Sequence, residues 1–318
     1  MYSLGNYLAM LSDEQRVSAY AGAIRALVKR GDRVIELGAG FGYFSILAAQ
    51  AGAARVDAVD LSPVIHLGPR LARANGCAER VRFHQADLLQ FEPDGRADVL
   101  IGDLRGPTPF SGRALEVVID ARRRMLSRGG LMIGRRDVLY CAPARRPSGY
   151  HERIAAPLSR PGVDLSPVAA VIGATPFPAF VTAAALLADG ASWGEIDYLT
   201  VESPNHRGAA EWTLTNGADV EGIAIWLEAD LGAGEGFSTA PGRPGNTYGQ
   251  VYLPFLSSVR AEPESVLRLE IAVHLVTGEY VWVWTARVRA AGGRELTIVS
   301  QNSMAERVID PAAFRNAL

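Results

Sequence analysis

The residues best suited to chemistry lie where an apolar strand runs into a helix, in the segment RVIELGAGFG at positions 33–42. Gly38 and Gly40 open a Gly-x-Gly-x-Gly turn, and Glu36 stands two residues before it. In a doubly wound sheet, ligands bind at the carboxyl ends of the strands, where glycines allow the backbone to come close to them. A dinucleotide-binding loop would have its third glycine at Tyr43, so the spacing is wrong for a pyrophosphate. Glu36 suits an ammonium group instead.

A second carboxylate follows the next apolar strand. Asp60 ends the run 56–60, a place where a carboxylate accepts both hydroxyls of a ribose. A ligand that carries an ammonium group and a ribose is the methyl donor S-adenosylmethionine. The alternative is a glycine turn that merely joins a strand to a helix, and it leaves Glu36 and Asp60 without a role. The two acids therefore predict S-adenosylmethionine as the cofactor.

Alternating strands and helices must position these residues. Hydrophobic periodicity predicts helices at 13–29, 43–51, 63–74 and about 112–126, and strands at 55–59, 81–84, 98–102 and 131–139. Ser12 is the expected N-cap of the first helix. Short strands with proline-rich connections follow, at 196–202, 211–215, 221–229, 250–253, 266–275 and 280–289. We expect an α/β fold, a doubly wound Rossmann-like domain over 1–141, and then a β-barrel domain over 142–318.

Composition places the chain among ordinary globular proteins. Its 318 residues are 48% hydrophobic and carry a net charge of -2, which allows a large core and favours two domains. The sequence has no apolar run long enough for a membrane span and no secretory-signal pattern, so the expected compartment is the cytoplasm. The near-neutral charge argues against nucleic acid as a partner. Cys77 and Cys141 lack the spacing of metal ligands, and no metal is expected.

Four segments of the chain resemble the protein arginine methyltransferases. They are MLSDEQR at 10–16, the glycine loop with Asp60, IGDLRG at 101–106 and GFSTAP at 236–241. Glycine loops occur in many methyltransferases, whereas the first and last segments are specific to this family. Together the four segments extend over nearly the whole chain. The resemblance implies a methyltransferase domain, a β-barrel domain with a short dimerisation arm, and S-adenosylmethionine as cofactor.

The resemblance also assigns the donor site. It implies that Arg16 binds the carboxylate of the donor, and that Glu36 and the backbone near Gly38 and Gly40 hold its methionine part. Asp60 is expected at the ribose. The remaining residues expected around the donor are Tyr7 and Met10 near the N-terminus, Leu61 beside Asp60, and Asp87 and Leu88 after the next strand.

The chain departs from the family at the acceptor site. The family holds a guanidinium between two glutamates on one loop, whereas here the first position is Asp103 and the second, counted without gaps, is Gly112. The histidine of the family's Thr-His-Trp segment is also replaced, in Thr247-Tyr248-Gly249. The chain is therefore expected to belong to a divergent bacterial-type branch, with Asp-Leu-Arg-Gly at this loop and an acceptor of its own.

Methyl transfer to a guanidinium needs carboxylates. A group with a pKa of about 12.5 to 13.8 resists deprotonation, and its charge must be held on the nitrogens that do not attack. Asp103 has the best position for this task. Glu116, one helical turn beyond Gly112, is a candidate replacement for the missing glutamate, and Asp13 is a third acidic candidate. The alternatives are a solvated helix position for Glu116 and a helix-start role for Asp13.

Arg105 brings a fixed positive charge close to Asp103. A bidentate grip on a carboxylate of the acceptor would explain this arginine. Such a grip favours a free amino acid or another small zwitterion over a residue inside a protein. The alternative is pairing within the chain, with Asp103 or Asp120.

Three functions are compatible with these residues. The first is an S-adenosylmethionine-dependent N-methyltransferase that acts on the guanidino or amino nitrogen of a small molecule, with L-arginine as the leading candidate. The second is a protein or peptide arginine N-methyltransferase. The third is a non-catalytic methyltransferase-like regulator. The resemblance further implies a homodimer, and the apolar segment at about 165–190 is the candidate arm.

Overall fold

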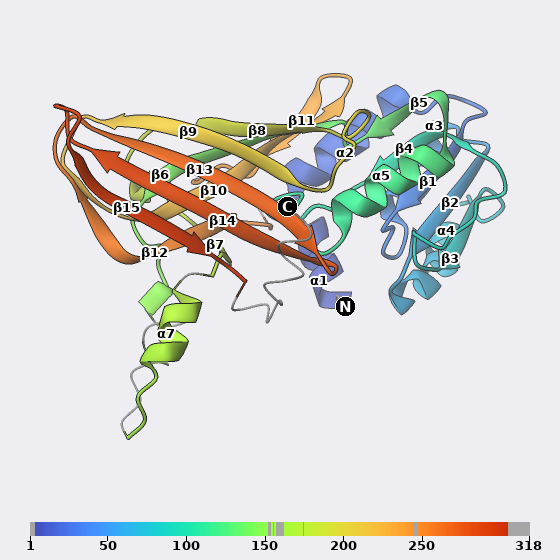
Figure 1. Ribbon diagram of the computed structural model, residues 1–318. Coiled ribbons are helices and arrows are strands. Elements are labelled where there is room, and N and C mark those ends of the chain that lie inside the picture. The colour runs from blue at the N-terminus through green and yellow to red at the C-terminus, as the bar shows by residue number, and fades with distance from the viewer. Residues whose placement is uncertain are drawn as a thin grey trace.

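The computed structural model describes residues 4–151, 154, 156, 162–173, 175–243 and 247–304. They form two domains that lie end to end, a parallel α/β domain followed by an antiparallel domain (Figure 1). This arrangement confirms the predicted fold, a Rossmann-like domain followed by a β-barrel domain. Residues 305–318, at the end of the expected barrel domain, lie outside the described residues.

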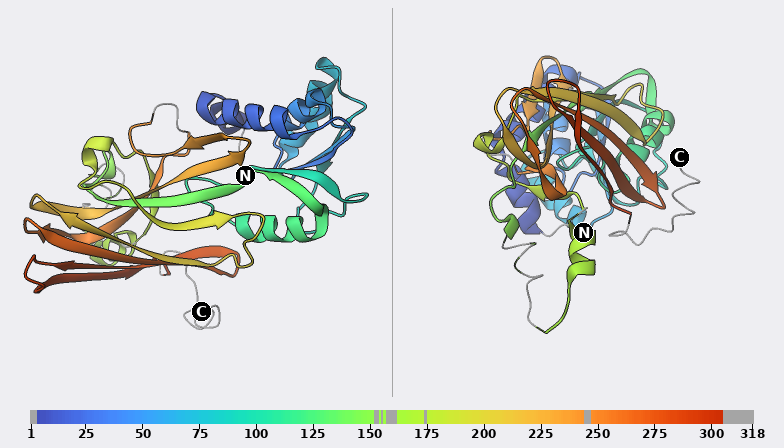
Figure 2. Two further views of the ribbon diagram at one scale, coloured as in Figure 1. Left: turned by 90° about the horizontal axis from the view of Figure 1, so that it is seen from above. Right: turned by 60° about the vertical axis from the view of Figure 1, so that its left-hand side comes forward.

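The α/β domain is built on a sheet of five parallel strands. In sheet order they are β3 (Val81–Gln85), β2 (Arg55–Asp60), β1 (Arg33–Leu37), β4 (Ala97–Gly102) and β5 (Leu126–Ile133). Helices α2 (Glu14–Leu27) and α3 (Tyr43–Ala51) lie on one side of the sheet and α5 (Ala114–Met125) on the other (Figure 2). The strand order reverses beside β1, so the loops after β1, β2 and β4 surround one crevice.

Two helix starts differ from the prediction. Asp13, rather than Ser12, is the N-cap of α2, because its carboxylate accepts a hydrogen bond from the backbone N–H of Arg16 at 3.1 Å. Ser12 instead donates from its hydroxyl to the carbonyl of Leu8, in the turn that ends α1 (Leu4–Leu11). The predicted helix at 63–74 divides into the 3-10 helix η1 (Pro63–Leu67) and α4 (Gly68–Ala74). Pro69 lacks an N–H group and therefore favours a new helix start there.

The barrel domain consists of two antiparallel sheets. The first has the order β7 (Phe177–Ala179), β12 (Gln250–Ala261), β10 (Ala218–Gly232), β6 (Arg136–Ala144) and β8 (Ala191–Asp197), with β11 (Glu235–Ser238) paired to β10. The second has the order β15 (Glu295–Asn302), β14 (Glu279–Arg289), β13 (Ser265–Val276) and β9 (His206–Leu214). The strand predicted at 196–202 is wrong, because β8 ends at Asp197, whose carboxylate turns the chain by accepting from Leu199 N–H. No predicted strand covers β7, β11 or β15.

The single strand predicted at 131–139 is two strands in the structure. β5 ends at Ile133 in the parallel sheet, and β6 begins at Arg136 in the antiparallel one. Gly134 between them has a φ of 88°, and an added Cβ would lie 2.5 Å from the carbonyl oxygen of Gly102. Only glycine fits this turn. The chain therefore passes from the parallel sheet to the antiparallel one at 134–135.

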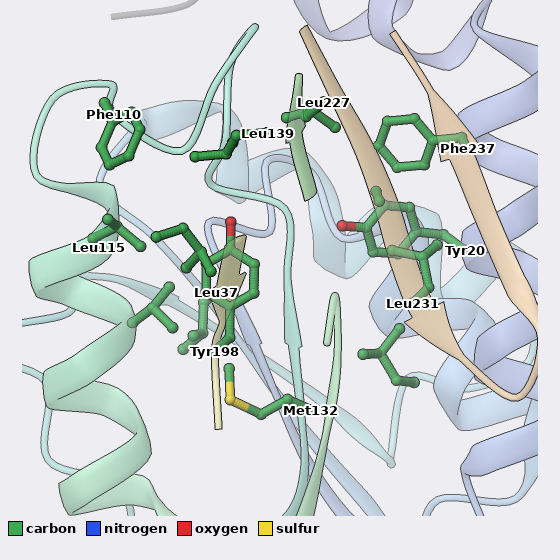
Figure 3. Close-up of a cluster of buried hydrophobic side chains, with 14 of the residues drawn as sticks. Tyr20, Leu37, Phe110, Leu115, Met132, Leu139, Tyr198, Leu227, Leu231 and Phe237 are labelled. Atoms are coloured by element: carbon green, nitrogen blue, oxygen red, sulfur yellow. The ribbon is translucent and has the colours of Figure 1, made fainter. Parts of the chain in front are cut away.

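The two domains share one continuous hydrophobic core. Figure 3 shows the part of it at the joint, where Tyr20, Leu37, Phe110, Leu115 and Met132 of the α/β domain meet Leu139, Tyr198, Leu227, Leu231 and Phe237 of the barrel domain. Tyr20 stacks on Phe44 with ring centroids 4.7 Å apart, and its ring centroid lies 6.3 Å from that of Phe237. The crevice of the parallel sheet is thus held against the barrel domain.

The segment expected as an arm, at about 165–190, projects only in its first part. Helix α7 (Ser166–Ile172) stands away from both sheets (Figure 1), whereas β7 returns to pair with β12 and the 3-10 helix η3 (Ala183–Ala185) follows it. Val168 on α7 is 45% exposed and Phe180 is 66% exposed. None of the helices in the described ranges is long and apolar enough to cross a membrane.

Candidate active site

Two adjoining cavities lie at the carboxyl ends of β1, β2 and β4. The larger has a volume of about 500 Å³ and the smaller of about 70 Å³. Both are lined by Tyr7, Met10, Gly38 and Asp103. The larger is further lined by Asp60, Leu61, Ala86, Asp87, Leu88, Leu89, Leu104, Arg105, Ser111, Arg113, Ala114, Val117 and Tyr248. The smaller is further lined by Leu11, Arg16, Glu36, Ala39, Gly40, Phe41, Tyr43 and Phe44.

The glycine loop after β1 lets side chains pack directly on its backbone. Gly38 and Gly40 have φ values of 73° and 56°, a region that residues with a Cβ rarely adopt. An added Cβ at Gly40 would lie 2.6 Å from Cε1 of Tyr7, and one at Gly38 would lie 2.4 Å from Cδ2 of Leu104. The loop, helix α1 and the loop after β4 therefore form one continuous wall between the two cavities.

Asp60 is held in place by the backbone around it. Its Oδ2 accepts a hydrogen bond from Gly40 N–H and its Oδ1 one from Ser62 N–H, both at 2.7 Å. These bonds link the end of β2 to the glycine loop. The carboxylate still has lone pairs for a hydroxyl of a ligand, since each oxygen has about two acceptor sites, and Asp60 lines the larger cavity.

Glu36 is a buried carboxyl at the end of β1. It lines the smaller cavity, and the hydroxyl of Ser45 donates to its Oε2. Burial raises the pKa of Glu36 to about 8, although the hydrogen bonds from Ser45 act in the opposite direction. A cation in the smaller cavity would favour the ionised form of this carboxyl.

Arg16 is buried and crosses from α2 to the site. Its guanidinium donates to Asp103 Oδ2 and to the carbonyl oxygen of Met10. Burial by itself lowers the pKa of Arg16, but Asp103 raises it above its ordinary value. The arginine thus joins the end of α1 to the loop after β4 and remains charged where it meets the smaller cavity.

Asp103, directly after β4, is the point where both domains converge. The hydroxyl of Tyr20 on α2 shares its proton between the carbonyl oxygen of Gly102 at 2.8 Å and Oδ1 of Asp103 at 3.1 Å. The hydroxyl of Tyr248, just before β12, donates to Oδ2 of Asp103 at 3.1 Å. Burial and the nearby carboxylate raise the pKa of Tyr248 above its ordinary value, so this phenol stays a donor. Asp103 is thus an oriented carboxylate at the junction of the two cavities.

Arg105 forms an ion pair inside the chain. Its Nη1 lies 2.8 Å from Oδ1 of Asp137 on β6, and its Nε lies 3.9 Å from Oδ1 of Asp103. Its side chain is only 3% exposed. Pairing within the chain, the alternative to a contact with an acceptor carboxylate, is therefore present, with Asp137 as the main partner, and Arg105 also lines the larger cavity. Asp120 pairs with Arg124 instead.

The structure does not bring Glu116 or Asp13 to the cavities. Both oxygens of Glu116 accept from Arg113, at 2.6 and 2.9 Å. Asp13 caps α2 and also accepts from Thr247 N–H at 3.0 Å. Neither acid is among the lining residues of the described cavities. The expectation of two further acids beside Asp103 is thus corrected, because local partners hold both side chains.

All residues predicted for the donor line one of the two cavities. Three polar partners of Asp103 and Arg105 were outside the predicted set, namely Tyr20, Tyr248 and Asp137. Tyr248 had a sequence signal, since it stands at the position of the family's histidine. Asp137 had none, because a single acid in an apolar strand does not reveal which loop it will face.

Comparison with known proteins agrees with this geometry. Residues 34–130 match the family described as a methyltransferase domain. Over 166 residues, 51% of the chain, the sequence is 34% identical to the probable protein arginine N-methyltransferase 6 of Arabidopsis thaliana. The chain resembles the arginine methyltransferases. This match covers 38% of the Arabidopsis protein, and the matches to two rice relatives cover 39% of each.

The likeness to arginine methyltransferases extends over both domains in other relatives. The arginine N(omega)-methyltransferase of Streptomyces achromogenes subsp. streptozoticus is 24% identical over 273 residues, which are 83% of this chain and 75% of that protein. The structure of the Trypanosoma brucei PRMT1 enzyme-prozyme complex with AdoHcy has a TM-score of 0.83 at 19% identity, over 94% of this chain and 98% of that one. Arabidopsis thaliana protein arginine methyltransferase 10 has a TM-score of 0.81 at 20% identity, over 94% and 97%. These structures confirm the fold.

Proposed function

We propose that the protein is an S-adenosylmethionine-dependent N-methyltransferase that acts on the guanidino or amino nitrogen of a small molecule, with L-arginine as the leading acceptor. The observation that carries this proposal is the position of Asp103, which lines both cavities and is oriented by two tyrosines. A carboxylate at that junction is placed to hold the cation of an acceptor next to a bound donor.

The residues of the cavities fit the methyl donor. Glu36 is a buried carboxyl that a ligand ammonium group would stabilise, and Arg16 in the same smaller cavity offers a guanidinium to a ligand carboxylate. Asp60 faces the larger cavity at the position expected for a ribose, with Asp87 and Leu88 beyond it for the adenine. When bound, the donor supplies an electrophilic methyl group on a sulfonium.

The protein itself contributes to methyl transfer by positioning the acceptor and by excluding water from the site. Methyl transfer is an in-line displacement, so the attacking nitrogen must be held close to the methyl group with its lone pair aligned. Asp103 binds the acceptor's other nitrogens and keeps the positive charge on them. Tyr20 and Tyr248 fix the two carboxylate oxygens, and Met10 and Leu104 give the cavity apolar walls.

Two observations support a small acceptor. Gly112, at the place of the family's second glutamate, is exposed, and no side chain would contact a Cβ built there. Glu116 is held by Arg113 and does not replace that glutamate. In addition, the Streptomyces relative, matched over 75% of its length, is named arginine N(omega)-methyltransferase. The protein arginine N-methyltransferase 1 of Schizosaccharomyces pombe is matched over a similar share, 72%, so the name of the Streptomyces relative, and not the length of its match, is the support. The Arabidopsis match, at 34% identity, supports the second candidate, a protein or peptide arginine methyltransferase.

Mass spectrometry of methylation reactions tests the proposal. The full chain is incubated with the donor and with L-arginine, other free guanidines and amines, or an arginine-rich peptide. We expect a methylated free acceptor, and we expect Asp103→Asn to lower its formation by about 100-fold or more, as for other groups that orient reacting charge. Asp219→Asn, which removes an exposed aspartate of the barrel domain, is the matched control and should leave the rate unchanged.

The other outcomes favour the other two functions. Methylation of the peptide alone would favour the protein or peptide methyltransferase. Binding of the donor in calorimetry without modification of any acceptor would favour a non-catalytic regulator.

We further propose that the chain forms a homodimer through its arm. Val168 and Phe180 in the segment 165–190 are exposed apolar side chains, and Leu256 on β12 is 53% exposed. The solved Trypanosoma brucei relative is a heterotetrameric complex. Sedimentation velocity at micromolar concentration should show a dimer, and a Phe180→Asp variant should be monomeric. A monomeric wild-type chain would refute the dimer.

A further inference from the structure

Arg105 is a buried cation for which the proposed function gives no direct task. It lies in the loop after β4, two residues beyond Asp103, and is 6% exposed. Its guanidinium contacts two carboxylates, Asp137 at 2.8 Å and Asp103 at 3.9 Å. One of these acids lines the cavities, and the other lies fully buried on the first strand of the barrel domain.

The barrel domain holds this guanidinium from several directions. The hydroxyl of Tyr198 donates to Oδ2 of Asp137 at 2.6 Å, so both oxygens of that carboxylate are engaged. The rings of Tyr198 and Phe237 have their centroids 5.5 and 5.8 Å from Cζ of Arg105, within the range of cation–π attraction. Figure 3 places both rings in the core shared by the two domains.

The backbone at the domain joint closes tightly on the same side chain. A Cβ added to Gly134 would lie 2.8 Å from Nη2 of Arg105. The neighbouring cavity, lined by Arg105, Gly134 and Tyr198 among others, has a volume of only about 10 Å³. The guanidinium is therefore closely packed on the side of the domain joint, and the loop that carries Asp103 is anchored with it.

The ion pair also balances the charge beside Asp103. Arg16 and Arg105 both approach this carboxylate. If Arg105 had no partner, two buried cations would face one acid, and an acceptor cation would be repelled. Asp137 neutralises Arg105, and the donor carboxylate is the expected partner of Arg16. Arg16 is paired with Asp103 in the donor-free structure, so the charge of Asp103 becomes available to the acceptor once the donor carboxylate binds Arg16.

We propose that Arg105 and Asp137 are positioning residues, an ion pair through which the barrel domain orients Asp103 and keeps its negative charge available to a cationic acceptor. This inference rests on the proposed function. Arg105 also lines the larger cavity, whereas Asp137 does not, and in this inference both residues act on the acceptor through Asp103.

The Asp137→Asn variant tests the inference, because it leaves Arg105 charged and unpaired in nearly the same volume. Steady-state kinetics are measured with the acceptor that the wild type methylates best. The KM for this acceptor should rise by about tenfold or more, because the substitution leaves the buried charge of Arg105 without its partner. The donor Kd from calorimetry should stay within about twofold of wild type, because Arg16 and Glu36 are intact. The matched control Asp219→Asn, which breaks an exposed ion pair with Arg260, should change neither quantity.

A second variant covers the case in which Asp137→Asn does not fold. Tyr198→Phe keeps every charge and removes only the hydroxyl that binds Asp137, and it should raise the acceptor KM by about threefold. A folded variant with an unchanged acceptor KM would overturn the inference, as would a donor Kd weakened by the same factor as the acceptor KM. A wild-type chain that methylates no guanidine or amine would refute the proposed function and this inference together, whereas an active wild type with unaffected variants refutes the inference alone.

Discussion

The hydroxyl of Tyr248 donates a hydrogen bond to Oδ2 of Asp103 at 3.1 Å, and this contact joins the barrel domain to the loop after β4. The hydroxyl of Tyr20, on α2, shares its proton between the other oxygen of the same carboxylate at 3.1 Å and the carbonyl oxygen of Gly102 at 2.8 Å. Asp103 is therefore oriented from both domains. The direction in which the Asp103 carboxylate points depends on how the two domains are joined, so neither domain alone would orient it.

The first prediction concerns the phenol of Tyr248. Tyr248→Phe removes a hydrogen bond to a charged group, which contributes about 1.5–3 kcal/mol, so we expect kcat/KM for the acceptor to fall by about 10- to 100-fold. Steady-state kinetics measure this, and Tyr140→Phe is the matched control, since Tyr140 stacks on Trp226 in the barrel domain. An unchanged kcat/KM would mean that Tyr248 does not hold Asp103 in the working enzyme.

The second prediction concerns the pH dependence of donor binding. Burial raises the pKa of Glu36 to about 8 in the donor-free chain, and the donor's ammonium group favours the ionised form. Donor binding below this pKa therefore releases a proton from Glu36. The donor Kd should fall by about tenfold per pH unit as the pH rises toward the pKa, and level off above it. Calorimetry over this range should show the slope in the wild type and lose it in Glu36→Gln.

The raised pKa of Glu36 also makes the free energy of unfolding of the donor-free protein depend on pH. Its folded pKa, about 8, lies above the ordinary value of 4.5. The contribution is therefore fully present below about pH 4.5 and is lost as the pH rises through 8. Urea unfolding of the donor-free chain should show the free energy of unfolding of the wild type falling relative to Glu36→Gln across this window. Parallel pH profiles for the two proteins would show that the Glu36 pKa is not raised.

The third prediction separates backbone strain from contact in the glycine loop. Gly40→Ala places a Cβ 2.6 Å from Tyr7, whereas Gly31→Ala, at a φ of 97°, meets nothing within 4 Å. Both variants should lose about 1–2 kcal/mol of folding free energy, because alanine is strained at positive φ. Only Gly40→Ala should also weaken donor binding, because it pushes α1 away from the loop. Equal donor affinities for the two variants would contradict this packing.

The fourth prediction concerns the acid that the sequence offered as a second catalytic carboxylate. Both oxygens of Glu116 are bound by Arg113 at a half-exposed position. Glu116→Gln should therefore change the acceptor turnover by no more than about threefold, in line with the small contribution of exposed ion pairs. Asp103→Asn, assayed beside it, should show a far larger loss. A comparable loss in both variants would restore Glu116 as a catalytic candidate.

The residues predicted for the donor lie together at two adjoining cavities because they follow a local rule. Glu36, Gly38, Gly40 and Asp60 all lie at or just after the carboxyl end of an apolar strand. In a parallel sheet those ends meet at one edge, so strand positions alone place the residues together. The spacing of the glycines and the acids along the sequence was therefore enough to predict that these residues lie close together.

Element boundaries were less predictable where side chains compete for the backbone. Asp13 takes the N-cap of α2 although Ser12 was the expected cap, and both residue types are good caps. The apolar run at 131–139 continues through two strands, and Gly134 alone marks the passage between them. Hydrophobic periodicity does not distinguish one buried strand from two that belong to different sheets.

By itself, the sequence determined that a doubly wound domain with a donor-type glycine loop precedes a second, strand-rich domain, because those features depend on local periodicity and on residues near strand ends. Only the tertiary structure decided the state of Arg105 and Asp103. Asp137 and Tyr248 reach these two residues from strands and loops far along the chain. The packing of the two domains decides which residues become such partners. A buried charge is costly unless it is paired, so it pairs with the opposite charge that lies nearest in the packed structure. The packing therefore gives Arg105 an internal partner, Asp137, that its position in the sequence did not indicate.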